Sequence, residues 1–321
     1  MPRAARPARD GGASPQGQAG LPQGQPWPAR RATVSGRALV YRHTPGGPHA
    51  QPALYLHGLG GSSTNWTDLA GLLADVLDGD AFDLPGYGAS DPPAGGDYRL
   101  PAQATSVVAL LTERRRGPVH LIANSLGGAV AVVVAARRPD LVRTLTLVSP
   151  AMPDLRPHNR VRALLSACAI PGVQPLAERR LLGLSPEERV RQVIGTVFGD
   201  PSRVPAHRIA EAVVEGERRA ALPWSDDAFV RSLRGLLTAY LSPGDRSLWS
   251  QARQVRAPTL IVWGMKDVLV PMHVARRTTT QIPGARLLLL PGVGHVAQLE
   301  APAEVATAIR ELLGSSRAGS C

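Results

Sequence analysis

Three residues whose side chains can act together in catalysis stand far apart in the chain: Ser125, Asp267 and His295. A serine hydroxyl is a weak nucleophile near neutral pH, so it needs a base beside it and a third group that orients that base. Histidine commonly supplies the base and a carboxylate the orienting group. The chain order serine, acid, histidine is typical of serines on a strand-turn-helix motif and differs from the order in other serine triads. These residues therefore predict acyl transfer through a serine nucleophile.

Ser125 lies where the chain changes from strand-like to helix-like composition. Val119–Ile122 is an apolar β-type run, and 127–136 is rich in small residues that a helix accepts. This predicts a strand, a very tight turn and a helix, with the serine at the apex. The usual pattern is Gly-x-Ser-x-Gly; here Ala123 replaces the first glycine and Gly127 keeps the second, so both positions stay small. An ordinary turn that happens to contain a serine is the alternative.

The predicted base and acid each follow an apolar strand. His295 ends the glycine-rich stretch after strand 286–290, and Asp267 follows strand 259–263 by a few residues. Strand ends of a parallel sheet meet at one edge, where ligands bind. A histidine between glycines can also be a turn residue, and an aspartate after a strand can be a helix cap. Asp154, shortly after strand 141–149, is an alternative acid.

Acyl transfer also needs donors for the oxyanion of the tetrahedral intermediate. The backbone N–H of Leu126, directly after the nucleophile, is one expected donor, and that of Leu59, after strand 53–56, is the other. His57 is expected to brace the Leu59 loop. Trp66 and Asn124 are expected near the substrate pocket.

The surrounding elements alternate between strands and helices, which predicts a parallel sheet flanked by helices. The expected strands are 38–41, 53–56, 81–84, 119–122, 141–149, 259–263 and 286–290, and the expected helices are 65–77, 102–116, 127–137, 273–281 and 302–313. The alternation stops at Pro150 and resumes near 257. The fold class is therefore α/β, with one long insertion.

The insertion, 151–256, offers only helical segments. Ser185-Pro186-Glu187-Glu188 predicts a capping box that starts a helix over 186–198, and Ser225 starts another that reaches Leu241. An insertion at the ligand-binding edge of the sheet predicts a lid. The apolar residues expected to face inward from it are Leu164, Leu165, Val193, Leu236 and Leu237.

The chain ends and the overall composition set further limits. Residues 1–36 are rich in Pro, Gly and Arg without periodicity, which predicts disorder, and 315–321 is expected to be a flexible tail. The core is then 37–150 with 257–314. The net charge of +11 comes from scattered arginines, with Lys266 the only lysine, which argues against nucleic-acid binding.

The remaining sequence signals concern membranes, metals and compartment. No apolar run reaches membrane-spanning length, and the N-terminus lacks the apolar core of a secretory signal. Cys168 and Cys321 form neither a disulfide framework nor a metal-ligand spacing. We therefore expect a cytoplasmic protein without a membrane span, a metal or a cofactor.

Taken together, these stretches make the chain resemble the α/β-hydrolase superfamily, in particular its lidded branch of esterases, cofactor-free haloperoxidases and carbon–carbon bond hydrolases. The matching stretches are His57-Gly58-Leu59-Gly60-Gly61, Asp83-Leu84-Pro85-Gly86-Tyr87-Gly88-Ala89-Ser90, Ala123–Gly128, Trp263–Pro271, and Gly294-His295 with Glu300 and Pro302. In such proteins the Asp83 stretch is a structural loop. Epoxide hydrolases and haloalkane dehalogenases of similar appearance have aspartate as the nucleophile, so Ser125 argues against both.

The residues and the resemblance together predict a cofactor-independent serine hydrolase that cleaves a carboxylic ester through an acyl-enzyme on Ser125. The expected partner is a small-molecule substrate with an apolar acyl or aryl group. A carbon–carbon bond hydrolase of a ring-cleavage diketone would use the same three residues. A third hypothesis is that the chain is a non-catalytic ligand-binding protein of this fold. The sequence decides neither the substrate nor the oligomeric state.

Overall fold

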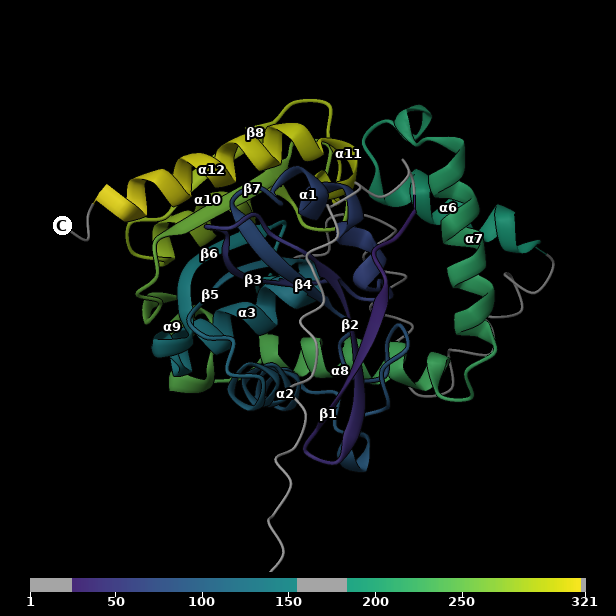
Figure 1. The fold of residues 1–321 in the computed structure, drawn as a ribbon, viewed down its shortest axis with the longest axis horizontal. Coiled ribbons are helices and arrows are strands. Elements are labelled where there is room, and N and C mark those ends of the chain that lie inside the picture. Colours follow the sequence, from purple (N-terminus) through teal and green to yellow (C-terminus); the bar gives the residue numbers. More distant parts are fainter. Residues whose placement is uncertain (1–24, 155–183, 319–321) are drawn as a thin grey trace, which may run out of the picture.

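The computed structural model describes residues 25–154 and 184–318. In these residues eight strands form a single sheet in the order β1-β2-β4-β3-β5-β6-β7-β8 (Figure 1). The strands are β1 (Ala29–Val34), β2 (Arg37–Thr44), β3 (Gln51–Leu56), β4 (Leu77–Phe82), β5 (Val119–Asn124), β6 (Val142–Val148), β7 (Thr259–Gly264) and β8 (Arg286–Leu290). β2 pairs antiparallel with β1 and β4, and all other pairings are parallel. The predicted α/β class with a mostly parallel sheet is confirmed.

Helices cover both faces of the sheet. One layer contains α2 (Leu100–Glu113), α3 (Ser125–Arg137), α9 (Leu248–Arg253) and α10 (Met272–Gln281), whose buried side chains share one apolar cluster. The other layer contains α1 (Thr67–Leu72), α11 (Ala297–Glu300) and α12 (Pro302–Ala318). The central strands are buried on both faces, which is why β5 and β7 are mainly apolar along their whole length.

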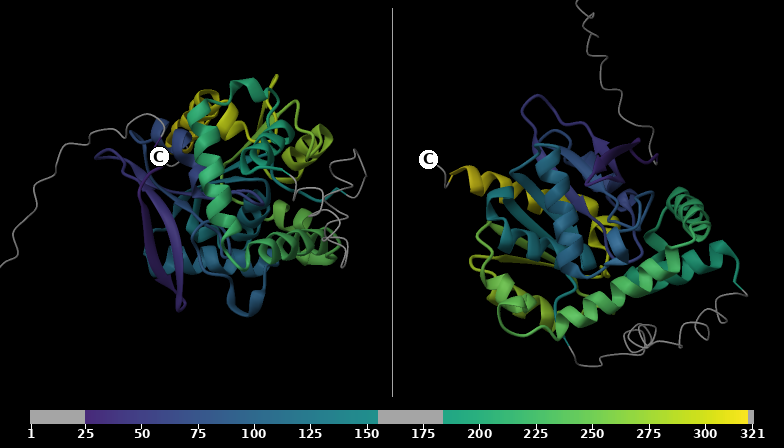
Figure 2. Two further views of the ribbon diagram at one scale, coloured as in Figure 1. Left: turned by 90° about the vertical axis from the view of Figure 1, so that its right-hand side faces the viewer. Right: turned by 90° about the horizontal axis from the view of Figure 1, so that it is seen from below.

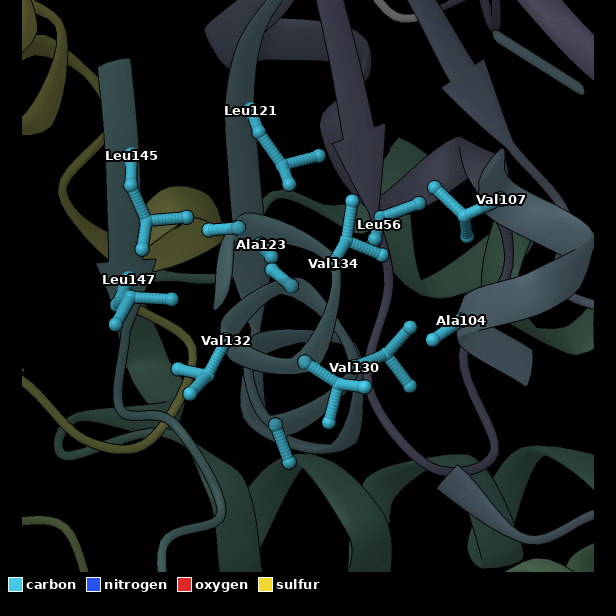
Figure 3. Close-up of a cluster of buried hydrophobic side chains, with 14 of the residues drawn as sticks. Leu56, Ala104, Val107, Leu121, Ala123, Val130, Val132, Val134, Leu145 and Leu147 are labelled. Carbon is cyan, nitrogen blue, oxygen red and sulfur yellow. The ribbon is translucent and has the colours of Figure 1, made fainter. Parts of the chain in front are cut away.

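α3 is the central helix of its layer. Val130, Val132 and Val134 pack among Leu121, Leu145 and other residues of the cluster drawn in Figure 3. Every residue from Leu126 to Ala135 is buried, so the helix has no polar face. This all-round burial explains its small and β-branched composition, and it fixes the start of the helix, where Ser125 stands, to the sheet.

The described part of the insertion contains α6 (Pro186–Val197), α7 (Ala206–Ala220) and α8 (Ser225–Tyr240). α6 and α7 lie outside both helix layers, whereas α8 packs against α2 at the border of the first layer. Figures 1 and 2 show α6 and α7 beside the sheet, with α8 running past α2. The predicted capping box at Ser185 is present, since its Oγ accepts from the Glu188 N–H and the Glu188 carboxylate accepts from the Ser185 N–H.

α9 does not belong with these helices. Leu248, Trp249 and Ala252 are part of the core cluster beside α3 and α10. The predicted insertion boundary at residue 256 is therefore too late, because the chain has already returned to the core layer by Leu248. Ala151 and Met152, at the other end of the predicted insertion, also lie in that cluster.

The prediction of disorder for 1–36 is wrong for its last part. Ala29–Val34 is strand β1, and Ser35 and Gly36, with φ of 49° and 76°, form the two-residue loop that leads into β2. Two positive φ values in such a loop are typical of a type I′ hairpin turn. Only Val34 of this strand is buried. The strand is therefore held by its backbone ladder with β2 rather than by an apolar face.

Two helix ends also differ from the prediction. α12 continues to Ala318, past the expected end at 313, because adding residues to a formed helix needs far less free energy than starting one. The expected helix over 65–77 ends at Leu72, since Leu77 already pairs in β4. Residues 1–24, 155–183 and 319–321, with Leu164, Leu165 and both cysteines, lie outside the described residues. Within the described ranges, no helix combines the length and apolar composition needed to cross a membrane.

Candidate active site

Ser125 stands at the apex of a strained turn between β5 and α3. Its φ is 52°, in the left-handed region that residues with a side chain rarely adopt. The strand ends at Asn124 and the helix begins at Ser125 itself, so no loop separates them. The carbonyl of Ser125 accepts a hydrogen bond of 2.9 Å from the Ala151 N–H, which ties the turn to the end of β6. The predicted strand, tight turn and helix are confirmed.

Gly127 shows why the turn needs small residues. A Cβ at this position would lie 2.5 Å from the His57 carbonyl oxygen and 2.6 Å from that of Leu56, which are both backbone atoms of the neighbouring strand end. The backbone cannot yield there without moving β3 or α3. Ala123 is fully buried in the core cluster, so its methyl group is accommodated.

We therefore expect Gly127→Ala to lower the free energy of unfolding by at least about 1–3 kcal/mol, the usual cost of overpacking a dense core. Gly195→Ala is the matched control, because a Cβ on that exposed α6 residue meets nothing within 4 Å. It should stabilise the protein by about 0.5–1 kcal/mol through helix propensity. Urea unfolding of both variants checks the pair, and equal stabilities would contradict the close approach at Gly127.

His295 and Asp267 are joined by a hydrogen bond of 2.8 Å between Nδ1 and Oδ2. Their side chains are only 5% and 1% exposed. The other Asp267 oxygen, Oδ1, accepts from the backbone N–H groups of Leu269 and Val270 at 2.8 and 2.9 Å. The carboxylate is thus fixed by three donors, and the imidazole presents Nε2 as its remaining nitrogen.

Asp154, the alternative acid, contacts a different histidine. Its Oδ2 lies 3.0 Å from Nε2 of His273, near the start of α10. The structure therefore brings Asp267, and not Asp154, to His295.

The strand ends gather Ser125, Asp267, His295 and Leu59 at one edge of the sheet, because β3, β5, β7 and β8 run parallel. The loop after β3 lies directly against the serine: a Cβ on Gly58 would be 3.1 Å from the Ser125 Cβ. The Leu59 N–H belongs to this loop, and the Leu126 N–H is among the first helical donors, which have no partner within a helix. The two expected oxyanion donors thus belong to segments that adjoin Ser125.

His57 holds this loop, as expected. Its Nδ1 lies 2.7 Å from the Gly58 carbonyl oxygen, and its Nε2 accepts from the Leu84 N–H at 3.1 Å. Because Leu84 can only donate, the proton of the neutral ring is on Nδ1. Asp83 is equally structural, since its carboxylate accepts from the N–H groups of Ser63 and Ala89.

Burial lowers the pKa of His57 below its usual value, and the cation of Arg219 adds to this, while Asp83, Glu215 and the Gly58 carbonyl oppose it. The unfolded chain then binds a proton at a higher pH than the folded chain. The contribution of His57 to the free energy of unfolding is therefore complete above the unfolded pKa of about 6.5, and it is lost as the pH falls through that value.

We expect His57→Gln to be less stable at neutral pH and to lose part of the decline in unfolding free energy between about pH 6.5 and 5. Urea unfolding of the variant and the wild type across this range measures that slope. A decline that is unchanged in the variant would show that another group causes it.

Asn124 and Trp66, the two predicted substrate-binding residues, are both buried. Asn124 is 3% exposed, and its Nδ2 donates to the carbonyl oxygens of Val148 (3.0 Å) and His295 (3.2 Å). Trp66 is fully buried on the α1 side of the sheet, with its ring 5.4 Å from that of Tyr55. Trp66 has no exposed surface, so a substrate contact is not supported for it. Asn124 joins the Ser125 turn to the His295 loop, and its substrate contact stays a prediction.

The described residues that were expected to face inward from the insertion differ from one another in burial. Val193 on α6 is 59% exposed, while Leu236 on α8 lies in the core cluster and Leu237 is half-buried. A contact that the sequence did not indicate comes from α7, where Arg219 donates to the Gly60 carbonyl oxygen at 2.9 Å. Among the described residues, no group of three or more His, Cys, Asp and Glu is placed to hold a metal ion.

Comparison with known proteins gives a family match. The model of the family described as "alpha/beta hydrolase fold" matches residues 52–302. A curated relative from Pseudomonas putida, the dihydrolipoyllysine-residue acetyltransferase component of the acetoin cleaving system, is 31% identical over 294 residues, which are 90% of this chain and 70% of that one. Lipase 1 of Psychrobacter immobilis is 28% identical over 291 residues, or 88% of this chain and 84% of that one.

A solved structure extends the likeness of fold. The meta-cleavage product hydrolase of Pseudomonas fluorescens IP01 superposes with a TM-score of 0.71, over 89% of this chain and 98% of that one. The two sequences are 20% identical, so the similarity concerns the fold alone.

Proposed function

The chain belongs to the alpha/beta hydrolase fold family, and on that premise we propose that it is a serine hydrolase that cleaves carboxylic esters. The observation that carries the proposal is the buried His295–Asp267 pair at the edge of the sheet where Ser125 occupies its strained turn. Similarity to a lipase favours an ester substrate.

In the proposed reaction the Ser125 Oγ attacks the ester carbonyl carbon while His295 Nε2 accepts the hydroxyl proton. The N–H groups of Leu59 and Leu126 stabilise the resulting oxyanion. The same proton then passes from His295 to the departing alkoxide, which leaves an acyl group on Ser125. Water repeats the sequence, and the carboxylic acid is released. Asp267 holds the imidazole with Nε2 unprotonated at the start and stabilises the cation that forms. No cofactor takes part in these steps.

We further propose that α6, α7 and the first part of α8 cover the catalytic edge as a lid over a small, mainly apolar substrate. Contacts of these helices with the core support this. Arg219 on α7 donates a hydrogen bond to the Gly60 carbonyl oxygen, in the loop after β3 that contains Leu59. The Tyr87 hydroxyl donates to the Ala228 carbonyl oxygen on α8 at 3.2 Å. The proposed lid therefore contacts the core next to the catalytic site, through α7 and α8.

The second candidate is hydrolysis of a carbon–carbon bond in a ring-cleavage diketone, which would use the same Ser125, Asp267 and His295. A meta-cleavage product hydrolase shares this fold. A panel of p-nitrophenyl esters with short to medium acyl chains, beside one such diketone, separates the two. Ester turnover with no turnover of the diketone is the expected result. Diketone turnover without ester turnover would replace the first proposal by the second.

A further inference from the structure

Glu300 is a buried carboxylate that accepts hydrogen bonds from three backbone N–H groups. It is 6% exposed and stands at the end of α11, outside the proposed triad. Its Oε2 accepts from Gly294 at 2.7 Å and from Gly199 at 2.9 Å, and its Oε1 accepts from Asp200 at 2.9 Å. Gly294 directly precedes His295, whereas Gly199 and Asp200 follow helix α6 of the insertion.

The two segments that Glu300 joins also touch through their backbones. The His295 N–H donates to the Val197 carbonyl oxygen at 2.7 Å. A Cβ on Gly294 would lie 2.5 Å from that same oxygen, and one on Gly199 would lie 2.3 Å from the Gly292 carbonyl oxygen. Glycine at these positions therefore permits a backbone-to-backbone contact that Glu300 holds together.

The opposite side of His295 is held by the nucleophile turn. Its carbonyl oxygen accepts from Asn124 Nδ2 at 3.2 Å, and Asn124 directly precedes Ser125. The backbone of His295 is therefore held by a hydrogen bond from Asn124 on one side, and by Val197 and the Glu300–Gly294 hydrogen bond on the other.

We propose that Glu300 is a positioning residue that couples the insertion to the catalytic histidine, an inference that rests on the proposed function. A carboxylate suits this position because both of its oxygens accept and neither donates. Hydrogen bonds to an ionised acceptor are stronger than neutral ones, so the three N–H groups stabilise the buried charge and are themselves ordered by it. Movement of 197–200 then moves the His295 loop, and with it the distance from Nε2 to the Ser125 hydroxyl.

The test compares Glu300→Ala and Glu300→Gln with the wild type, by ester turnover and by the rate of labelling with a fluorophosphonate. Glu300→Ala should lower kcat and the labelling rate together by about 10- to 100-fold, the size of effect that a displacement of about 1 Å produces, while KM changes by less than about threefold. Glu300→Gln keeps one oxygen, which can still accept from Gly294 and Gly199, but its NH₂ group then faces the Asp200 N–H, which also donates. It should therefore recover only part of the lost rate.

Glu304→Gln is the matched control, because this exposed residue on α12 is four positions away and is not placed in the site. It should behave as the wild type. All rates are compared at a temperature where circular dichroism shows each variant folded. If Glu300→Ala does not fold, the test is the comparison of Glu300→Gln with the wild type.

The outcomes separate the two proposals. If the wild type and both Glu300 variants label at the same rate, or if the loss lies in KM alone, Glu300 does not position His295 and the proposed function stands. If the folded wild type does not label at all, the proposed function falls and this inference falls with it. A graded loss in kcat, with the glutamine variant between alanine and wild type, supports the coupling.

Discussion

Replacing Ser125 by alanine is expected to lower kcat for ester hydrolysis by about 10⁴- to 10⁶-fold, the range seen when a serine nucleophile is removed. The hydroxyl is the atom that bonds to the acyl group, and water in its place lacks both the position and the covalent intermediate. The turn itself should persist, because alanine has the same Cβ at the φ of 52° that serine already adopts. Initial rates on a p-nitrophenyl ester, with circular dichroism to show an unchanged fold, measure the effect.

Ser149→Ala is the matched control for this substitution. Ser149 also stands directly after a strand, has a positive φ of 42° and is fully buried. Its hydroxyl has no hydrogen-bond partner in the part of the chain that the structure describes. This variant should keep its rate within about threefold, since a buried hydroxyl without a partner contributes little. Substantial activity in a folded Ser125→Ala protein would rule out the serine nucleophile.

Asp267→Asn should lower kcat by about 10⁴-fold, as it does where an amide replaces the acid of a serine triad. The surrounding bonds give the reason. Leu269 and Val270 donate N–H groups to Oδ1, so the amide oxygen must face them, and the amide NH₂ must face His295 Nδ1. Nδ1 then has to accept a hydrogen bond, which leaves the proton on Nε2. In that tautomer the ring cannot take the serine proton.

Asp154→Asn tests the alternative acid under the same conditions. Asp154 contacts His273 rather than His295, so its rate should stay within about threefold of the wild type. A large loss in Asp154→Asn combined with a small one in Asp267→Asn would reverse the assignment of the acid.

Much of the site could be predicted because its residues follow strands of mainly apolar composition. β5 and β7 are buried along their whole length, and the edge strand β8 is a run of leucines. The polar residues after these strands must stand at the same edge of a parallel sheet. Neither the strand ends nor the order of Ser125, Asp267 and His295 depends on knowing how distant segments pack.

The rest depends on packing between distant segments, which no local pattern encodes. Glu300 meets Gly199 and Asp200 across about one hundred residues, and its sequence neighbours give no sign of these partners. Trp66 follows a loop that passes the site, but its side chain turns to the opposite face of the sheet, beside Tyr55. β1 escaped prediction because only Val34 of it is buried, although the Ser35-Gly36 pair was a hairpin signal.

The central claim, that Ser125 is an activated nucleophile, is tested most directly by mass spectrometry of the protein after reaction with a fluorophosphonate. Activation here depends on His295 and Asp267, so the reagent should bond to one serine and not to serines in general. The account predicts a single adduct, on the peptide that contains Ser125, which is absent from Ser125→Ala and forms far more slowly in Asp267→Asn. A folded wild-type protein without an adduct, or with its adduct on another serine, would contradict it.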